Sequence, residues 1–173
     1  RDGTMLVEKA YLSDPRGVEL VPGTIEALTE LREAGFSLVI VTNQSGIARG
    51  LYSLDDYHAV AARLMTMLHE AGASVDATYY CPHHPLVSGD CPCRKPGTGM
   101  HLSASTDLGL DLRSSYYIGD KWSDVEPALT LDGQGILVRT GYGTDHERDV
   151  PEQIWVADDL RSAAHRIRRE SGR

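Results

Sequence analysis

The feature that most constrains the fold is a repeated order along the chain: a short apolar run, then polar residues, then a helix-like segment. The apolar runs predict strands over residues 37–41, 77–80, 116–118, 135–138 and 155–156. A continuous apolar run suits a strand that is covered on both faces, as in a parallel sheet. Strands that alternate with helices of ten or more residues are typical of a doubly wound α/β fold.

Apolar spacing and capping residues predict the helices between these strands. We expect helices over residues 24–34, 53–71 and 100–108, and a last one capped by Asp158 or Asp159. Ser53 with Asp56 and Ser123 with Glu126 each resemble a capping box, in which the two side chains satisfy free backbone N–H groups. Without repeats or linkers, residues 1–173 are expected to form one domain.

Polar clusters follow three of the predicted strands at the ends where the chain leaves them. They are residues 42–45, 81–95 and 119–121. Doubly wound sheets bind ligands outside the carboxyl ends of their strands. The sequence therefore predicts that these three clusters form a single site.

Composition and charge exclude several classes of protein. The net charge of −8 argues against nonspecific binding of nucleic acid, which needs a basic surface. The chain contains no apolar run long enough for a membrane span and begins without an apolar export signal. Three cysteines, an odd number, fit a disulfide framework poorly. We therefore expect a cytoplasmic protein, and a monomer, without nucleic-acid or membrane partners.

The spacing of the cysteines predicts a zinc site. Cys81 and His83 form one pair and Cys91 and Cys93 another, so that residues 81–93 carry every cysteine of the chain. Three thiolates and one imidazole suit a closed, tetrahedral, structural Zn²⁺ site. His84 is an alternative imidazole that spacing cannot separate from His83. A disulfide with one spare thiol is the competing interpretation.

Five stretches in a fixed order resemble one known family. They are RDGT at residues 1–4, VTNQSGIARG at 41–50, YYCPHHP at 79–85, CPCRKPGTGM at 91–100 and YIGDKWSD at 117–124. Together they resemble the haloacid dehalogenase superfamily, and within it the heptose bisphosphate phosphatases and the related histidinol-phosphatase domain. The resemblance covers essentially the whole chain. It implies a capless, Rossmann-like phosphatase domain, because no long insertion follows residue 50.

The resemblance also assigns the residues of the reaction. The motif of the family begins one residue earlier, with a nucleophilic aspartate, so that residue and its strand are expected directly before Arg1. Asp2 resembles the general acid and base, which protonates the leaving oxygen and then activates water. Its backbone carbonyl and the carboxylate of Asp120 would bind Mg²⁺. Asp124 is expected to support this site from one helical turn further along.

Two further residues resemble the groups that bind the transferring phosphoryl group, namely Thr42 and Lys95. The remaining residues expected to contact the substrate are Glu8, Tyr11, Asn43, Gln44, Ser45, Arg94 and Lys121. The Arg94 guanidinium suits a second, non-reacting phosphate, because it can form two parallel hydrogen bonds. The zinc loop would direct Arg94 and Lys95 toward the substrate.

The expected function is a Mg²⁺-dependent phosphatase that forms an aspartyl-phosphate and removes the C7 phosphate of D-glycero-D-manno-heptose 1,7-bisphosphate. Two alternatives stay open. Histidinol phosphate would use the same chemistry, although a cationic substrate would favour an acidic pocket. A non-catalytic zinc-binding module would account for the zinc ligands and for a chain in which the nucleophile is absent.

Overall fold

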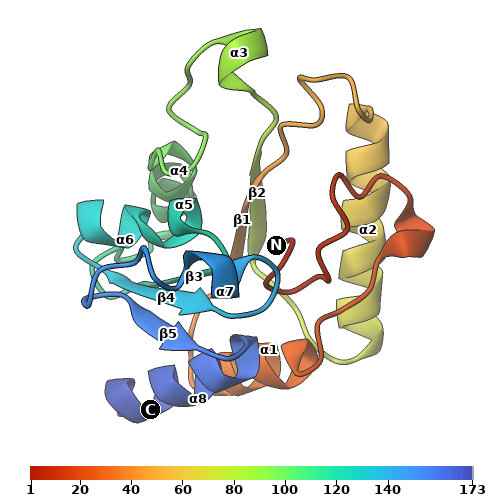
Figure 1. Cartoon of the computed structure of the whole chain (residues 1–173). Helices are drawn as coiled ribbons and strands as arrows, with labels where there is room; N and C mark the ends of the chain where they lie inside the picture. Colours follow the sequence, from red (N-terminus) through yellow and green to blue (C-terminus); the bar gives the residue numbers. More distant parts are fainter. Residues whose placement is uncertain (173) are drawn as a thin grey trace.

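Helices cover two small parallel sheets in the computed structural model, which describes residues 1–172 (Figure 1). The strands are β1 (Val39–Asn43), β2 (Ala77–Cys81), β3 (Tyr116–Gly119), β4 (Gln134–Val138) and β5 (Trp155–Ala157). The longer helices are α1 (Thr24–Glu33), α2 (Leu54–Glu70), α4 (Gly99–Leu108) and α8 (Leu160–Ser171). Short helical turns are η1 (Pro15–Gly17), α3 (Pro85–Ser88), α5 (Trp122–Val125), α6 (Pro127–Thr130) and α7 (Gly143–His146). The predicted α/β architecture is confirmed.

Strand pairing is parallel throughout. β1 pairs with β2, with Val39 opposite Ala77, while β4 lies between β3 and β5. The five predicted strands all exist, although β1 begins two residues later than expected. Leu38 lies before the strand because its N–H donates to the carboxylate of Asp76 at 2.6 Å rather than to a neighbouring strand.

The helix ends differ from the prediction at one place. Ser53 and Asp56 form the expected capping box of α2, and Asp159 caps α8. The predicted box of Ser123 and Glu126 is wrong, because α5 already begins at Trp122. Asp124 takes the role expected of Glu126, since its carboxylate accepts a hydrogen bond of 3.1 Å from the N–H of Lys121.

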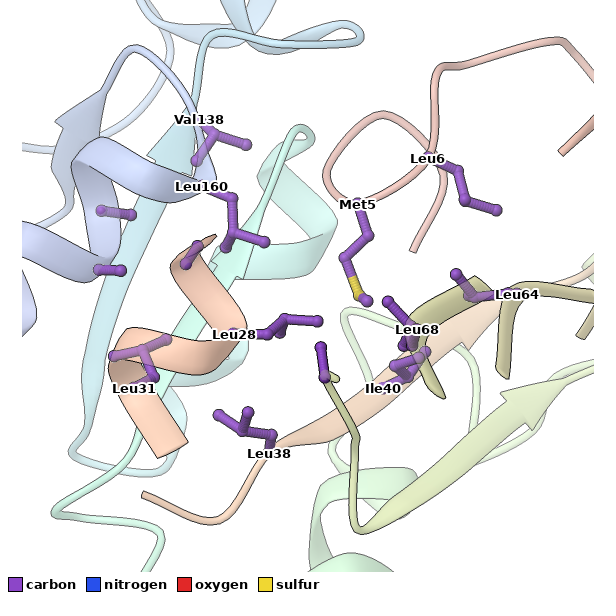
Figure 2. Packing of buried hydrophobic residues seen from close by; sticks show 14 of the residues in the cluster. Met5, Leu6, Leu28, Leu31, Leu38, Ile40, Leu64, Leu68, Val138 and Leu160 are labelled. Carbon is purple, nitrogen blue, oxygen red and sulfur yellow. The ribbon is translucent and has the colours of Figure 1, made fainter. Parts of the chain in front are cut away.

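The main apolar core lies between α1, α2, α8 and the strands (Figure 2). Leu28 and Leu31 of α1 point toward this core, as do Ile40 of β1 and Leu68 of α2. Met5 reaches it from the N-terminal loop. Burying a side chain of this size stabilises the fold by roughly 1.5–3 kcal/mol. No helix among residues 1–172 is long and apolar enough to cross a membrane.

A cavity of about 350 Å³ separates the two sheets. Its walls include Val39, Ile40 and Val41 of β1 and Tyr116, Tyr117 and Ile118 of β3. Within the described residues, neither of these strands pairs with another on the cavity side. Arg1, Lys95 and Asp124 line the end of the cavity at which both strands finish.

Candidate active site

Asp2 and Asp120 lie more than a hundred positions apart in the sequence and meet at the same edge of the fold. Gly3 joins them: a Cβ on this residue would lie only 2.1 Å from Oδ2 of Asp120. Gly3 also has a φ of +76°, a conformation that side chains other than glycine rarely adopt. Glycine at this position therefore lets the loop carrying Asp2 pack directly against the Asp120 carboxylate.

The Asp2 carboxylate is held from two sides. The Arg1 guanidinium donates to Oδ1 and Oδ2 from Nε and Nη2 at 3.0–3.2 Å, and Gln44 Nε2 donates to Oδ2 at 3.1 Å. The Arg1 guanidinium in turn lies 5.5 Å from the centre of the Tyr57 ring. Burial raises the pKa of Asp2, but the positive charges of Arg1 and the hydrogen bonds from Arg1 and Gln44 together outweigh it and hold that pKa below its usual value.

Asp120 is almost completely buried, with 1% of its surface exposed. The N–H of Tyr142 donates to its Oδ2 at 3.0 Å. Burial, with a contribution from the Asp124 carboxylate, raises the pKa of Asp120 to about 6. Within residues 1–172 no ammonium or guanidinium group forms an ion pair with Asp120. A buried carboxylate of this kind fits a divalent cation, which prefers oxygen ligands and supplies the missing positive charge.

Lys95 is the buried ammonium group of the site. It is 8% exposed; its Nζ lies 2.8 Å from Asp124 Oδ1 and donates to the Val41 carbonyl at 2.7 Å. Burial acts against ionisation of Asp124, yet Lys95 holds the pKa of Asp124 below its usual value. The ion pair fixes the ammonium group near the end of β1, against the carbonyl of Val41, which precedes Thr42.

Asn43 binds the backbone of Lys95, although the sequence predicted a contact with the substrate. Its Nδ2 donates to the Lys95 carbonyl at 3.1 Å, and its Oδ1 accepts from the Lys95 N–H at 3.0 Å. This reciprocal pair ties the segment that follows Cys93 to the end of β1. Gln44, also predicted to contact the sugar, is 4% exposed, and its amide bonds to Asp2, Thr42 and Tyr52.

Cys81, His83, Cys91 and Cys93 form the predicted metal-binding cluster. Their ligand atoms all lie within 4.8 Å of one another, and the three Sγ–Sγ distances are 3.0, 3.3 and 3.6 Å. Tetrahedral Zn²⁺ with Zn–S bonds of about 2.3 Å needs sulfur separations of about 3.8 Å, so the cluster fits this ion after small adjustments. His84 lies outside the cluster, where its Nδ1 accepts from the N–H of Leu86 at 3.3 Å.

The other predicted substrate contacts lie around the mouth of the site. Lys121 is 3.7 Å from Glu8 and its Nζ lies 4.4 Å from the centre of the Tyr142 ring. Tyr11, 47% exposed, accepts a hydrogen bond from Arg49, whose guanidinium lies over its ring. We call these residues the rim: Glu8, Tyr11, Arg49, Lys121 and Tyr142.

Arg94 and Ser45 lie on the loops next to the rim. Arg94 donates to the His83 carbonyl at 3.3 Å and so lies against the loop that carries the Cys/His cluster. Ser45 follows Gln44 directly in the turn that leaves β1, and is half-buried.

Sequence reasoning missed four residues that contact the predicted ones, namely Arg1, Arg49, Tyr52 and Tyr142. Arg49 lies in the quoted stretch at 41–50 and could have been singled out there. Tyr52 and Tyr142 carried no signal, because a tyrosine in a loop is as consistent with packing as with a site.

Comparisons with known proteins identify the family of the chain. A family model described as HAD-hydrolase-like matches residues 92–163. The D-glycero-beta-D-manno-heptose-1,7-bisphosphate 7-phosphatase of Yersinia pestis is 39% identical over 92% of this chain and 88% of its own length. The enzyme of the same name from Escherichia coli K12 is 38% identical over 98% of this chain and 92% of its own length.

The folds agree as well. The D,D-heptose 1,7-bisphosphate phosphatase of B. bronchiseptica, solved with magnesium and phosphate, superimposes with a TM-score of 0.90 at 31% identity. This match covers 98% of the present chain and 96% of that one. Identity above 30% over nearly the full length, together with the shared fold, settles the relationship. The chain belongs to the haloacid dehalogenase superfamily, in the family of the heptose 1,7-bisphosphate phosphatases.

Proposed function

We propose that this protein is a Mg²⁺-dependent phosphatase that removes the C7 phosphate of D-glycero-D-manno-heptose 1,7-bisphosphate through an aspartyl-phosphate. One observation carries the proposal: Asp2 and Asp120, more than a hundred positions apart, share one edge of the fold with the buried Lys95–Asp124 pair. The names of the relatives and the bound magnesium and phosphate of the B. bronchiseptica enzyme support it.

Asp2 is the proposed general acid and base. Its carboxylate lies at the edge of the fold and is held in one orientation by Arg1 and Gln44. It would give its proton to the leaving sugar oxygen and then take a proton from the water that hydrolyses the phospho-enzyme. Thr42 and Lys95 would bind the phosphoryl oxygens, with a hydroxyl donor and a buried positive charge respectively.

Mg²⁺ would be held by the Asp120 carboxylate and the backbone carbonyl of Asp2. The buried, raised-pKa carboxylate of Asp120 fits this role, because a cation supplies the charge that its surroundings lack. When bound, the ion offsets the repulsion between an anionic nucleophile and an anionic phosphate. Asp124 would serve indirectly, by holding Lys95 beside the phosphoryl group.

The nucleophilic aspartate is proposed to lie directly before Arg1, at the end of a strand that fills the cavity between β1 and β3. Two unpaired strand edges face that cavity, and the Arg1 side chain lines the end where both strands finish. Filling it with an apolar strand would join the two sheets into one and place a carboxylate beside Asp2 and Lys95. Pairing would also give strand partners to backbone groups on both edges, which have none within the described residues.

The Cys81–Cys93 cluster is proposed to hold structural Zn²⁺. All four positions are protein ligands, which leaves no open position for a reacting water. The ion would fix the loop that ends at Arg94 and Lys95. Arg94 and Lys121 are the proposed contacts to the non-reacting phosphate, while Ser45 and the rim residues Glu8 and Tyr11 would contact the sugar.

The remaining proposals concern the protein as a whole. We propose a single phosphatase domain over residues 1–173 that acts as a monomer in the cytoplasm. A phosphorylated sugar is its proposed partner, and neither nucleic acid nor a membrane is required. The acidic net charge is consistent with this, because a local cluster of cations can hold a phosphate within an acidic protein.

A phosphate-release assay on the intact gene product tests the proposal. Heptose bisphosphate and histidinol phosphate are compared with Mg²⁺ and with EDTA, and NMR of the product identifies which phosphate has left. We expect release of the C7 phosphate from the bisphosphate, abolished by EDTA, and much slower turnover of histidinol phosphate. Preference for histidinol phosphate would replace the proposed substrate. Tightly bound zinc without phosphate release from either compound would favour the non-catalytic module.

A further inference from the structure

Tyr52 returns to the site although it lies nine residues beyond the end of β1. The turn after Gln44 contains Gly46, and a Cβ on Gly46 would lie 2.1 Å from Cε1 of Tyr52. Glycine at this position therefore allows the ring to pack over the turn. As a result the Tyr52 hydroxyl donates to Oε1 of Gln44 at 2.6 Å. Tyr52 is 8% exposed and Gln44 is 4% exposed, so water competes little for this bond.

The hydroxyl of Tyr52 determines which way the Gln44 amide faces. An amide oxygen only accepts hydrogen bonds, whereas the amide nitrogen carries two N–H donors. With Oε1 held by Tyr52, Nε2 faces Asp2 Oδ2 at 3.1 Å and Thr42 Oγ1 at 2.9 Å. The reversed amide would place its oxygen against the Asp2 carboxylate, which is also an acceptor. Such an arrangement is repulsive in a buried position.

This orientation prepares both residues that Gln44 contacts. A threonine hydroxyl has one proton to donate and two lone pairs to accept with. Because Thr42 accepts from Gln44, its own proton stays available for a phosphoryl oxygen. On the other side, the Gln44 N–H keeps the Asp2 carboxylate in one rotamer, together with Arg1. One amide thus aligns the proposed acid and base with the proposed phosphoryl-binding hydroxyl.

We propose that Gln44 is a positioning residue rather than a contact to the sugar, and that Tyr52 acts through it by fixing its amide. This inference rests on the proposed function of the site. A sugar contact would affect substrate binding and therefore KM. A positioning residue aligns groups needed only during the reaction and therefore affects kcat.

Four variants of the intact protein test the inference with heptose bisphosphate as substrate. Tyr52→Phe removes one hydroxyl and keeps the ring, and Gln44→Met keeps the length of the side chain without its amide. The double variant combines the two. Tyr117→Phe is the matched control, because its buried hydroxyl donates to the Leu112 carbonyl at 3.0 Å, away from the site. Unfolding midpoints and zinc content are measured for each variant.

We expect Tyr52→Phe to lower kcat about fivefold and Gln44→Met about 100-fold, each with KM within about twofold of wild type. Adding Tyr52→Phe to Gln44→Met should lower kcat no further, because the hydroxyl has lost the group through which it acts. Tyr117→Phe should stay within about twofold of wild type. If Gln44→Met does not fold, Gln44→Glu takes its place in the same cycle.

Three results would overturn the inference while leaving the proposed function intact. They are a kcat of Tyr52→Phe no lower than that of Tyr117→Phe, effects that multiply in the double variant, and a raised KM with unchanged kcat in Gln44→Met. Absence of phosphate release from the wild-type protein would instead refute the proposed function, and this inference with it.

Discussion

The two lysines of the proposed site lie in opposite kinds of surroundings. Lys95 is 8% exposed, and its Nζ lies 2.7 Å from the Val41 carbonyl and 2.8 Å from the carboxylate of Asp124, whose side chain is 14% exposed. Lys121 has 40% of its side chain exposed, and its nearest carboxylate, Glu8, is 3.7 Å away. Removing one partner of a buried ion pair leaves the other charge unpaired in the interior, whereas an exposed ion pair contributes little to stability. The site therefore has two parts that differ in burial, namely the Lys95–Asp124 pair, which we call the interior edge, and the more exposed rim.

Substitution of Lys95 is the most severe test of the interior edge. Lys95→Met should lower kcat/KM at least about 10³-fold, because a preorganised charge next to the phosphoryl group is lost. It should also cost roughly 3–5 kcal/mol of unfolding free energy, because the largely buried carboxylate of Asp124 loses its partner. Phosphate release and urea unfolding measure the two effects. Lys9→Met, at an exposed ion pair with Glu19, is the control and should change neither. A Lys95→Met protein with wild-type stability would contradict the described role of the pair.

Removal of a proposed zinc ligand tests whether the interior edge depends on the loop beside it. Cys93→Ser should abolish stoichiometric zinc and lower activity at least tenfold, because the proposed ion would fix the loop that ends at Lys95. Metal analysis by mass spectrometry and the phosphate assay measure both. His84→Gln is the matched control: it alters the imidazole outside the cluster and should retain one zinc per chain. Full activity of a zinc-free Cys93→Ser protein would show that catalysis does not depend on metal bound to this loop.

The sequence predicted those parts of the molecule whose residues lie close together along the chain. Spacing along the chain was enough for the metal cluster, because Cys81 to Cys93 lie close together in sequence and the chemistry of zinc restricts the choice of ligands. Apolar periodicity was likewise enough to predict α2 and its buried face, which consists of Tyr57, Val60, Leu64 and Leu68. The choice between His83 and His84 needed coordinates, since both are adjacent imidazoles.

Contacts between distant segments lay beyond the sequence. Asn43 and Lys95 are 52 positions apart, and nothing local indicates that the amide of one binds the backbone of the other. The resemblance placed Asn43 and Gln44 near the substrate but could not say which atoms their amides would meet. The capping box of Ser123 and Glu126 was wrongly predicted for a related reason. The helix begins after Lys121, so the carboxylate of Asp124 accepts the hydrogen bond from the free N–H of Lys121.

A buried histidine beneath the interior edge makes stability depend on pH. His101 is 7% exposed, and burial, with a contribution from the Lys95 charge, lowers the pKa of His101 to about 4. The unfolded chain binds this proton at the ordinary histidine pKa of about 6.5, so acid favours unfolding. Stability is complete above that value and is lost as the pH falls toward 4. Between pH 7 and pH 5 the loss from this residue should be about 2 kcal/mol.

His101→Leu tests this contribution, because leucine keeps an apolar side chain in the pocket and cannot bind the proton. The fall in urea-unfolding free energy between pH 7 and pH 5 should be smaller in the variant by about 2 kcal/mol. Met100→Leu, a volume-conserving change at the neighbouring buried residue, should retain the wild-type dependence. An identical pH dependence in His101→Leu and wild type would show that His101 does not titrate as described.

The smallest effect is expected at the rim and completes the comparison of the two lysines. Lys121→Met should leave stability within about 0.5 kcal/mol, because its side chain is partly exposed and its ion pair with Glu8 is long. KM for the bisphosphate should rise several-fold while kcat stays within about twofold, because the lysine would contact the phosphate that does not react.

Salt provides a second criterion, since the electrostatic screening length falls to about 3 Å at 1 M. The KM difference between Lys121→Met and wild type should therefore narrow at high salt. A loss of kcat comparable to that of Lys95→Met would instead place Lys121 among the groups that act on the transferring phosphoryl group, and the contrast between interior edge and rim would no longer hold.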